Sequence, residues 1–175
     1  MKEVLVRFDC FLNDLGLQFE AIIIGGAALN IMDVITRETK DVDFLDPDIP
    51  EEIKNASVDF ALKNPDLKLA ANNWINNGPK SLTRDPPSGW RNDLQKIYEG
   101  SSLRLWTLGR LNLLRSKLYA YADRDTDYAD CIALNPTMAE LDVCKDWVLA
   151  GDGSELWPNR VEYIFQKLKE DLKLV

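Results

Sequence analysis

Histidine is absent from the 175-residue sequence. Its absence excludes Ser–His and Cys–His nucleophilic catalysis, together with every metal site that uses a histidine ligand. Any metal chemistry in this chain must therefore rely on oxygen ligands.

Cysteine is also scarce. Cys10, Cys131 and Cys144 are odd in number, far apart, and lack the paired spacing of a zinc site. We therefore expect reduced thiols buried in the core, as is usual for unpaired cysteines in a reducing compartment.

Long apolar runs are missing. No stretch approaches the about 18 apolar residues that a membrane-spanning helix needs, and the opening MKEVLVRFDCFLNDLG carries acids where a signal peptide has a clean apolar segment. We expect a cytoplasmic protein with no membrane partner.

The chain has few basic residues: 21 basic residues stand against 29 acidic ones, which gives a net charge of −8. This balance excludes a broad surface that coats nucleic acid. The few local basic concentrations are 80–84 with Arg91, and Arg104, Arg110, Arg115 and Lys117. They could contact RNA, with Trp74 and Trp90 stacking on bases, but such runs are more often solvated surface and such tryptophans more often fill a core edge.

Hydrophobic residues make up 46% of the chain, enough for a real core. The patterns predict helices at 3–15, 50–64, 109–122, 126–134, 137–149 and 158–173, and strands at 20–24, 41–45, 67–71 and 101–108. Residues 72–93, rich in Asn, Pro and Gly, predict a long functional or mobile loop. Thr137 and Glu140 have the spacing of a capping box.

A pair of glycines ends the first predicted strand, in the stretch IIIGGAALN at 22–30. Without Cβ atoms, Gly25 and Gly26 allow a sharp turn from strand to helix and the close approach of a phosphate to backbone N–H groups. A glycine pair alone is more often only a turn.

Two aspartates follow in the second predicted strand, in the stretch KDVDFLD at 40–46. Asp41 and Asp43 project from one face because residues i and i+2 of a strand share a side. A divalent cation such as Mg²⁺ turns their repulsion into coordination. An Asp-x-Asp pair alone is commonly a solvated face, so the functional interpretation depends on its joint occurrence with the glycines and with Arg37 and Thr39 between them.

The stretch GGAALNIMDVITRETKDVDFL resembles the signature of the nucleotidyltransferase superfamily, the DNA polymerase β-like fold. More narrowly, it is similar to minimal bacterial members, including the AbiEii-type toxins of abortive-infection systems. The matching positions are Gly25, Gly26, Ala28, Leu29, Arg37, Thr39, Asp41 and Asp43. The segment LLRSKLYAYADRDTDYADCIAL at 113–134 is similar to a downstream helical segment of those proteins, with matches at Lys117, Arg124, Asp127 and Asp130.

The resemblance implies an α+β fold: a nucleotidyltransferase-like mixed β-sheet flanked by helices in residues 1–108, with a C-terminal helical bundle in 109–175 packed on it as a single compact unit. It implies a nucleoside triphosphate and one or two Mg²⁺ ions, with Asp41 and Asp43 as metal ligands and catalytic residues. Gly25, Gly26, Arg37, Thr39 and Lys117 would bind nucleotide. Lys117 and Asp127 would also act in catalysis; by spacing alone, Lys117 is a solvated helix lysine and Asp127 a helix-terminal or ion-pair residue.

The implied reaction transfers a nucleoside monophosphate to a hydroxyl of RNA, protein or a small molecule, as in the toxin of a toxin–antitoxin pair with an antitoxin partner. Active relatives add a third carboxylate on a later strand, and the predicted strand SLRLWTL contains none. Asp93 or Glu99 would substitute only if the strand boundaries differ. The alternative is a catalytically degraded nucleotidyltransferase fold that works as a binding or partner-interaction module.

Overall fold

A computed structural model describes residues 1–78 and 89–174 of the chain. The chain divides into two compact units, Met1–Gly109 and Arg110–Val175. The sequence predicts a boundary after residue 108, and the packing of the two parts into one unit stays a prediction. Part of the predicted loop at 72–93, including the whole basic stretch 80–84, lies in 79–88 and so outside the described residues.

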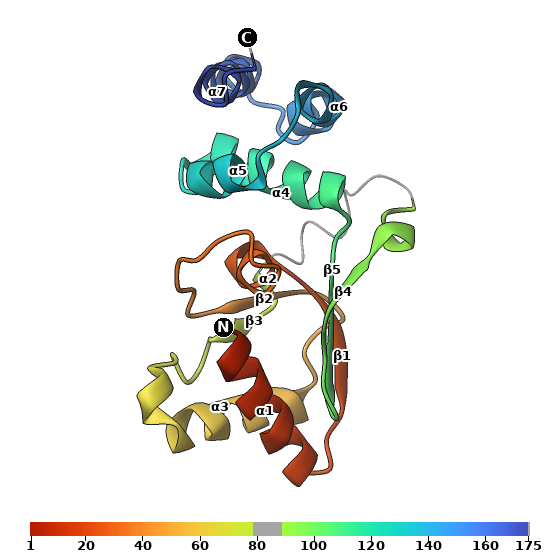
Figure 1. Ribbon diagram of the computed structural model, residues 1–175, viewed down its shortest axis with the longest axis vertical. Coiled ribbons are helices and arrows are strands. Elements are labelled where there is room, and N and C mark those ends of the chain that lie inside the picture. Colours follow the sequence, from red (N-terminus) through yellow and green to blue (C-terminus); the bar gives the residue numbers. More distant parts are fainter. Residues whose placement is uncertain (79–88, 175) are drawn as a thin grey trace. The chain divides into compact units, whose positions relative to one another are not determined.

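The first unit contains a five-stranded mixed sheet in the order β3-β2-β1-β5-β4 (Figure 1). Its strands are β1 Phe19–Ile24, β2 Val42–Asp46, β3 Ile75–Asn76, β4 Gln95–Glu99 and β5 Leu103–Thr107. Strand β1 pairs antiparallel with β2 and parallel with β5, while β3 runs parallel to β2 and β4 antiparallel to β5. The predicted α+β class is confirmed.

Two helices, α1 Lys2–Asp14 and α3 Glu51–Lys63, cover one face of this sheet (Figure 1). Phe8 of α1 lies 5.2 Å from Phe60 of α3 and 5.0 Å from Trp74, measured between ring centroids. Alternate residues of β1 and β5 complete this core because strand side chains alternate between faces: Phe19, Ala21, Ile23, Leu103 and Leu105. The short helix α2 Gly25–Ile31 follows β1 directly.

The second unit consists of α4 Arg110–Arg124, α5 Tyr128–Leu134, α6 Met138–Leu149 and α7 Trp157–Asp171. All four helices lie within two residues of their predicted bounds. The capping box at Thr137 and Glu140 is confirmed, since the Glu140 backbone N–H donates to Thr137 Oγ1 over 3.2 Å and the Thr137 N–H to Glu140 Oε2 over 2.9 Å.

Two predictions were wrong, and one strand was missed. The segment 67–71 forms no strand; a 3₁₀ turn at Pro65–Leu67 stands at its start. Strand β4 was missed because its polar sequence QKIYE lies at a sheet edge and has no apolar alternation. Cys10 is exposed rather than buried in the core, whereas Cys131 and Cys144 are buried as expected.

Candidate functional site

The glycine turn at the end of β1 lies directly against the second aspartate. Gly25 has φ +78°, a conformation that strongly favours glycine. A Cβ at this position would lie only 2.5 Å from Asp43 Oδ2. Both the backbone conformation and the space therefore require a glycine, and the turn and the carboxylate form one contact.

Gly26 brings two further predicted residues to the turn. A Cβ there would meet Arg37 Nη2 at 3.2 Å and Thr39 Oγ1 at 3.4 Å. Asn30 Nδ2 donates to the backbone oxygen of Arg37 over 3.1 Å, so α2 fixes the segment that carries the guanidinium. No local sequence pattern pointed to Asn30, because its role depends on the return of the chain at Arg37 to the side of α2.

The two aspartates have different surroundings. Asp43 pairs with Ile24 across β1 and β2, is partly buried, and accepts a hydrogen bond from Asn76 Nδ2 over 3.1 Å. Asp41 precedes β2, is exposed, and accepts one from Thr39 Oγ1 over 3.1 Å. Asn76 was missed, because the two-residue strand β3 that carries it exists only through pairing with β2.

The structure thus brings together six predicted residues, namely Gly25, Gly26, Arg37, Thr39, Asp41 and Asp43. Two neighbouring carboxylates fit Mg²⁺, which commonly takes one or two carboxylates plus substrate phosphates. Within 1–78 and 89–174, no group of three or more potential Asp, Glu or Cys ligands is assembled for a metal.

The two candidates for a third carboxylate lie near opposite ends of the sheet. Glu99 pairs with Arg104 at the end of β4 remote from the glycine turn. Asp93 precedes Gln95, which pairs with Thr107 at the end of β5 where β1 also ends, because β1 and β5 are parallel. Asp93 therefore lies toward the glycine end of the sheet and Glu99 does not.

Lys117 and Asp127 form a separate cluster in the helical unit. Lys117 Nζ donates to Asp127 Oδ1 over 2.7 Å and to Asp130 Oδ2 over 2.6 Å, and all three residues are buried. Arg124 lies 3.6 Å from Asp127 Oδ2, and Thr126 donates to the same oxygen. The structure contains the ion pair that was the alternative interpretation of Asp127. A role for Lys117 and Asp127 in catalysis stays a prediction.

Burial and the charge of Lys117 act in opposite directions on the pKa of Asp127. Burial acts to raise the pKa of Asp127, but the hydrogen bond and charge of Lys117 outweigh it, so the pKa lies below its ordinary value. Burial raises the pKa of the neighbouring Cys131 thiol to about 12. Asp127 is therefore ionised and Cys131 is an inert thiol at neutral pH.

The proposed base-stacking tryptophans do not face solvent. Trp74 is 1% exposed and donates its indole N–H to the Ser57 backbone oxygen, and Trp90 is 7% exposed. Both fill the core, so the alternative interpretation of these residues is the correct one. Arg110 is held by Glu140 Oε1 at 2.6 Å within the helical unit.

None of the described helices is long and apolar enough to cross a lipid bilayer.

A glycine turn packed on the carboxylate of Asp43, with Asp41 two residues before it, on a mixed sheet flanked by helices, is the arrangement of the nucleotidyltransferase class of proteins. The chain belongs to the family DUF6036, described as a nucleotidyltransferase of unknown function, whose model matches residues 4–144. No curated protein and no solved structure matches the chain.

Proposed function

We propose that this nucleotidyltransferase uses Mg²⁺ to transfer a nucleoside monophosphate from a nucleoside triphosphate to a hydroxyl group. The observation that carries the proposal is the contact of Gly25 with Asp43, which leaves no room for a side chain between the turn and the carboxylate. Family membership supports the same reaction class.

In this proposal, some residues of the site bind the phosphates and others bind the metal. Arg37, beside Gly26, supplies positive charge for the β- and γ-phosphates, and the glycine backbone admits them closely. Asp41 and Asp43 would hold one or two Mg²⁺ ions, and the bound metal would stabilise the charge on the transferred group and on the leaving pyrophosphate. Thr39 and Asn76 orient the two carboxylates through their hydrogen bonds.

The transfer balances without a further reactant. The acceptor oxygen forms a bond to the α-phosphorus as the bond from that phosphorus to the α–β bridging oxygen breaks. Pyrophosphate leaves with the electron pair, and the hydroxyl proton passes to water. Lys117 and Asp127 remain proposed contributors to this reaction, to be tested apart from their ion pair.

Calorimetric titration of each nucleoside triphosphate with Mg²⁺ into the wild type and an Asp41→Asn, Asp43→Asn double variant tests the proposal. We expect metal-dependent binding that the double variant abolishes. The control is Asp14→Asn with Asp59→Asn, which removes two exposed carboxylates of the same unit and should leave binding unchanged. Equal binding by wild type and double variant would contradict the proposal.

As the finer part of the proposal, the chain acts like the AbiEii-type toxins that it resembles, with an antitoxin as partner and RNA, protein or a small molecule as acceptor. Induced expression in a bacterial host should then arrest growth for the wild type and not for the double variant. Growth arrest by both would remove transfer as the cause of toxicity.

The second candidate is a binding module on a degraded site. The absence of a third metal-ligating carboxylate from the described residues favours it. This candidate predicts that triphosphates bind, or fail to bind, without any transfer of label from an α-³²P nucleotide to cellular RNA, protein or metabolites. If the wild type transfers label and the double variant does not, the protein is an enzyme and the binding-module candidate is excluded.

A further inference from the structure

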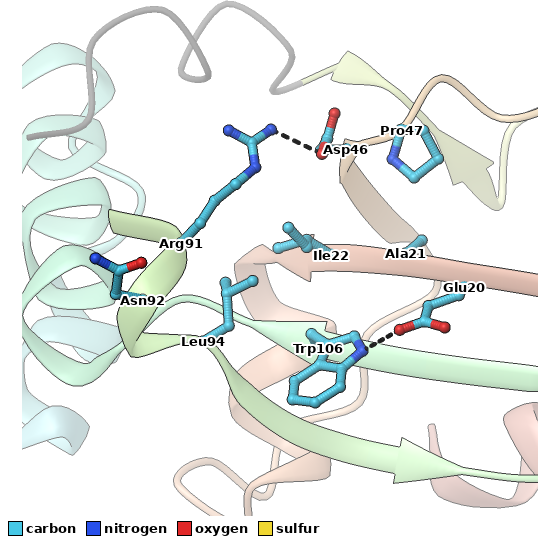
Figure 2. A pocket seen from close by; sticks show the side chains of 9 residues that line it. All are labelled: Glu20, Ala21, Ile22, Asp46, Pro47, Arg91, Asn92, Leu94 and Trp106. Atoms are coloured by element: carbon cyan, nitrogen blue, oxygen red, sulfur yellow. Dashed lines mark hydrogen bonds and ion pairs between the residues drawn. The ribbon is translucent and has the colours of Figure 1, made fainter. Parts of the chain in front are cut away.

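A pocket of about 520 Å³ lies on the sheet unit, lined by residues of β1, β2, β5 and the 3₁₀ turn Trp90–Asp93 (Figure 2). Its walls include Ile22, Leu94 and the indole of Trp106. This volume is within the range of small-molecule sites. The proposed function leaves it without a role.

The pocket opens on the same sheet face as Asp43. Ile22 and Ile24 of β1 share a face, and residues paired directly across strands share that face as well. Ile24 pairs with Asp43, Ile22 pairs with Asp46, and a register shift between Ile22 and Ile23 brings Asp46 to this side. The pocket therefore begins two residues, about 7 Å, along β1 from Asp43.

Asp43 lies between the glycine turn and the pocket. Gly25 and Gly26 follow Ile24 in the chain, whereas Ile22 and Glu20 precede it. In an in-line displacement at phosphorus, the attacking and leaving oxygens occupy opposite sides. If pyrophosphate departs on the glycine and Arg37 side, the attacking hydroxyl enters from the pocket side.

The lining selects against polyanions. Its ionisable members are Glu20, Asp46 and Arg91, two acids and one base. Arg91 is already bound to Asp46 Oδ2 at 2.8 Å, as Figure 2 shows. A phosphate-rich ligand would find no uncompensated cation in this lining. The excess of one acid over the single base does not oppose a neutral or cationic ligand.

The aromatic wall is held in place before any ligand arrives. Trp106 Nε1–H donates to Glu20 Oε1 over 2.8 Å, and Arg104 binds the other oxygen of Glu20 at 2.9 Å. The indole is thus oriented along the pocket, as Figure 2 shows, and offers a surface for a planar ring.

We propose that this pocket is the acceptor site, and that it takes a small, neutral or cationic compound that carries a hydroxyl group on or beside a planar ring. The assignment rests on the proposed function, which sets the direction of attack. It deepens that function by naming a small-molecule acceptor in place of RNA.

The first test uses tyrosinamide, a cationic phenol, as the probe, in a titration of protein labelled with ¹⁵N at its tryptophan indoles. The Trp106 signal is assigned by its loss in Trp106→Phe. We expect it to shift saturably, more strongly than with anionic N-acetyltyrosine, while the Trp147 signal in the helical unit stays fixed. A Trp106 signal that stays fixed with tyrosinamide overturns the assignment.

Two variants separate the pocket from the nucleotide site. Leu94→Trp, which fills the pocket, should weaken tyrosinamide binding about tenfold or more, the scale of one lost aromatic contact. Binding of Mg²⁺ and triphosphate should be unchanged. Trp147→Ala is the matched control and should change neither affinity. Displacement of tyrosinamide by the triphosphate would mean that the pocket binds the nucleoside of the donor, and would overturn the assignment.

The remaining outcomes distinguish this inference from the proposed function. Transfer of label to bulk tRNA but not to tyrosinamide overturns the small-molecule acceptor and leaves the nucleotidyltransferase. Failure of every triphosphate to bind the wild type overturns the proposed function and the acceptor role together.

Discussion

The two units of the chain use the same residue types in opposite ways. In the sheet unit, the carboxylates of Asp41 and Asp43 are exposed or partly buried and accept hydrogen bonds from the neutral side chains of Thr39 and Asn76. In the helical unit, Asp127 and Asp130 are buried and both bind the ammonium group of Lys117.

The comparison distinguishes carboxylates that stabilise the fold from carboxylates that can bind a ligand. Carboxylates that are paired with a buried cation stabilise the fold, because removal of one partner leaves an uncompensated charge in a low-dielectric interior. An exposed carboxylate such as that of Asp41 stays accessible to a cation from solution. We therefore expect stability to depend on the helical cluster and ligand binding on the sheet cluster.

The largest effect is expected for Lys117→Met. This change leaves two buried carboxylates without their cation, and we expect a loss of about 3–5 kcal/mol in the free energy of unfolding, measured by urea denaturation. The control is Lys167→Met, which breaks an exposed pair with Asp171 of 2.9 Å and should cost about 0.5 kcal/mol.

The Lys117→Met variant also tests whether the two clusters differ in role as we expect. If Lys117→Met costs less than about 1 kcal/mol and abolishes binding of Mg²⁺ and triphosphate, Lys117 is a nucleotide-binding residue. The predicted role of Lys117 and Asp127 in chemistry would then prevail over their role in stability.

The next effect is expected for Gly25→Ala. Positive φ alone costs an alanine about 1–2 kcal/mol, and here the new methyl group also displaces the Asp43 carboxylate. We expect a larger loss of stability than in Gly16→Ala, together with loss of triphosphate binding by calorimetry. Gly16 is the matched control, since its φ is +66° and nothing lies within 4 Å of its added Cβ.

Equal effects of the two glycine variants on stability and on binding would mean that Asp43 moves away without consequence. The contact between the turn and the carboxylate would then not be part of a site.

Local patterns in the sequence predicted individual features of both units. The glycine pair, the Asp-x-Asp alternation and the capping box of Thr137 are each readable from a few neighbouring residues. The four C-terminal helices likewise follow from apolar periodicity, because each buries one face in its own unit.

What the sequence could not predict depends on pairing between distant segments. Simple alternation places Asp46 on the face of Phe44, toward the core, and only the register shift between β1 and β2 turns it to the pocket side. Asn76 and the edge strand β4 likewise exist as elements only through their neighbours. The pocket at Trp106 was missed for this reason.

A smaller effect is expected for Glu140→Gln at the start of α6. Hydrogen bonds from Arg110 and from the Thr137 backbone lower the pKa of Glu140 from 4.5 to about 2. A carboxyl group whose pKa is lowered by folding stabilises the protein above its unfolded pKa, and this contribution disappears as pH falls through the folded value. The wild type should therefore lose this contribution between pH 4.5 and about 2.

At pH 7 the Gln variant should be about 1 kcal/mol less stable than wild type, the scale of a helix cap. The difference should vanish near pH 2, which a series of urea titrations across pH will measure. Glu155→Gln, at an exposed glutamate of the same unit, is the control. A difference that persists unchanged to the lowest pH would assign the loss to packing rather than to ionisation.

The smallest effect on folding is expected for Asp41→Asn, the exposed member of the sheet pair. Without metal, its free energy of unfolding should lie within about 0.5 kcal/mol of wild type, because an exposed carboxylate beside a like charge contributes little. With Mg²⁺ at ten times its dissociation constant, the wild type should gain about 1.4 kcal/mol, and the variant should gain less. The measurement is a pair of denaturation curves for each protein, with and without Mg²⁺, and Asp14→Asn should respond to the metal as wild type does. A variant that is strongly destabilised without metal, yet responds fully to Mg²⁺, would place Asp41 with the structural carboxylates of the helical unit and remove the distinction between the two clusters.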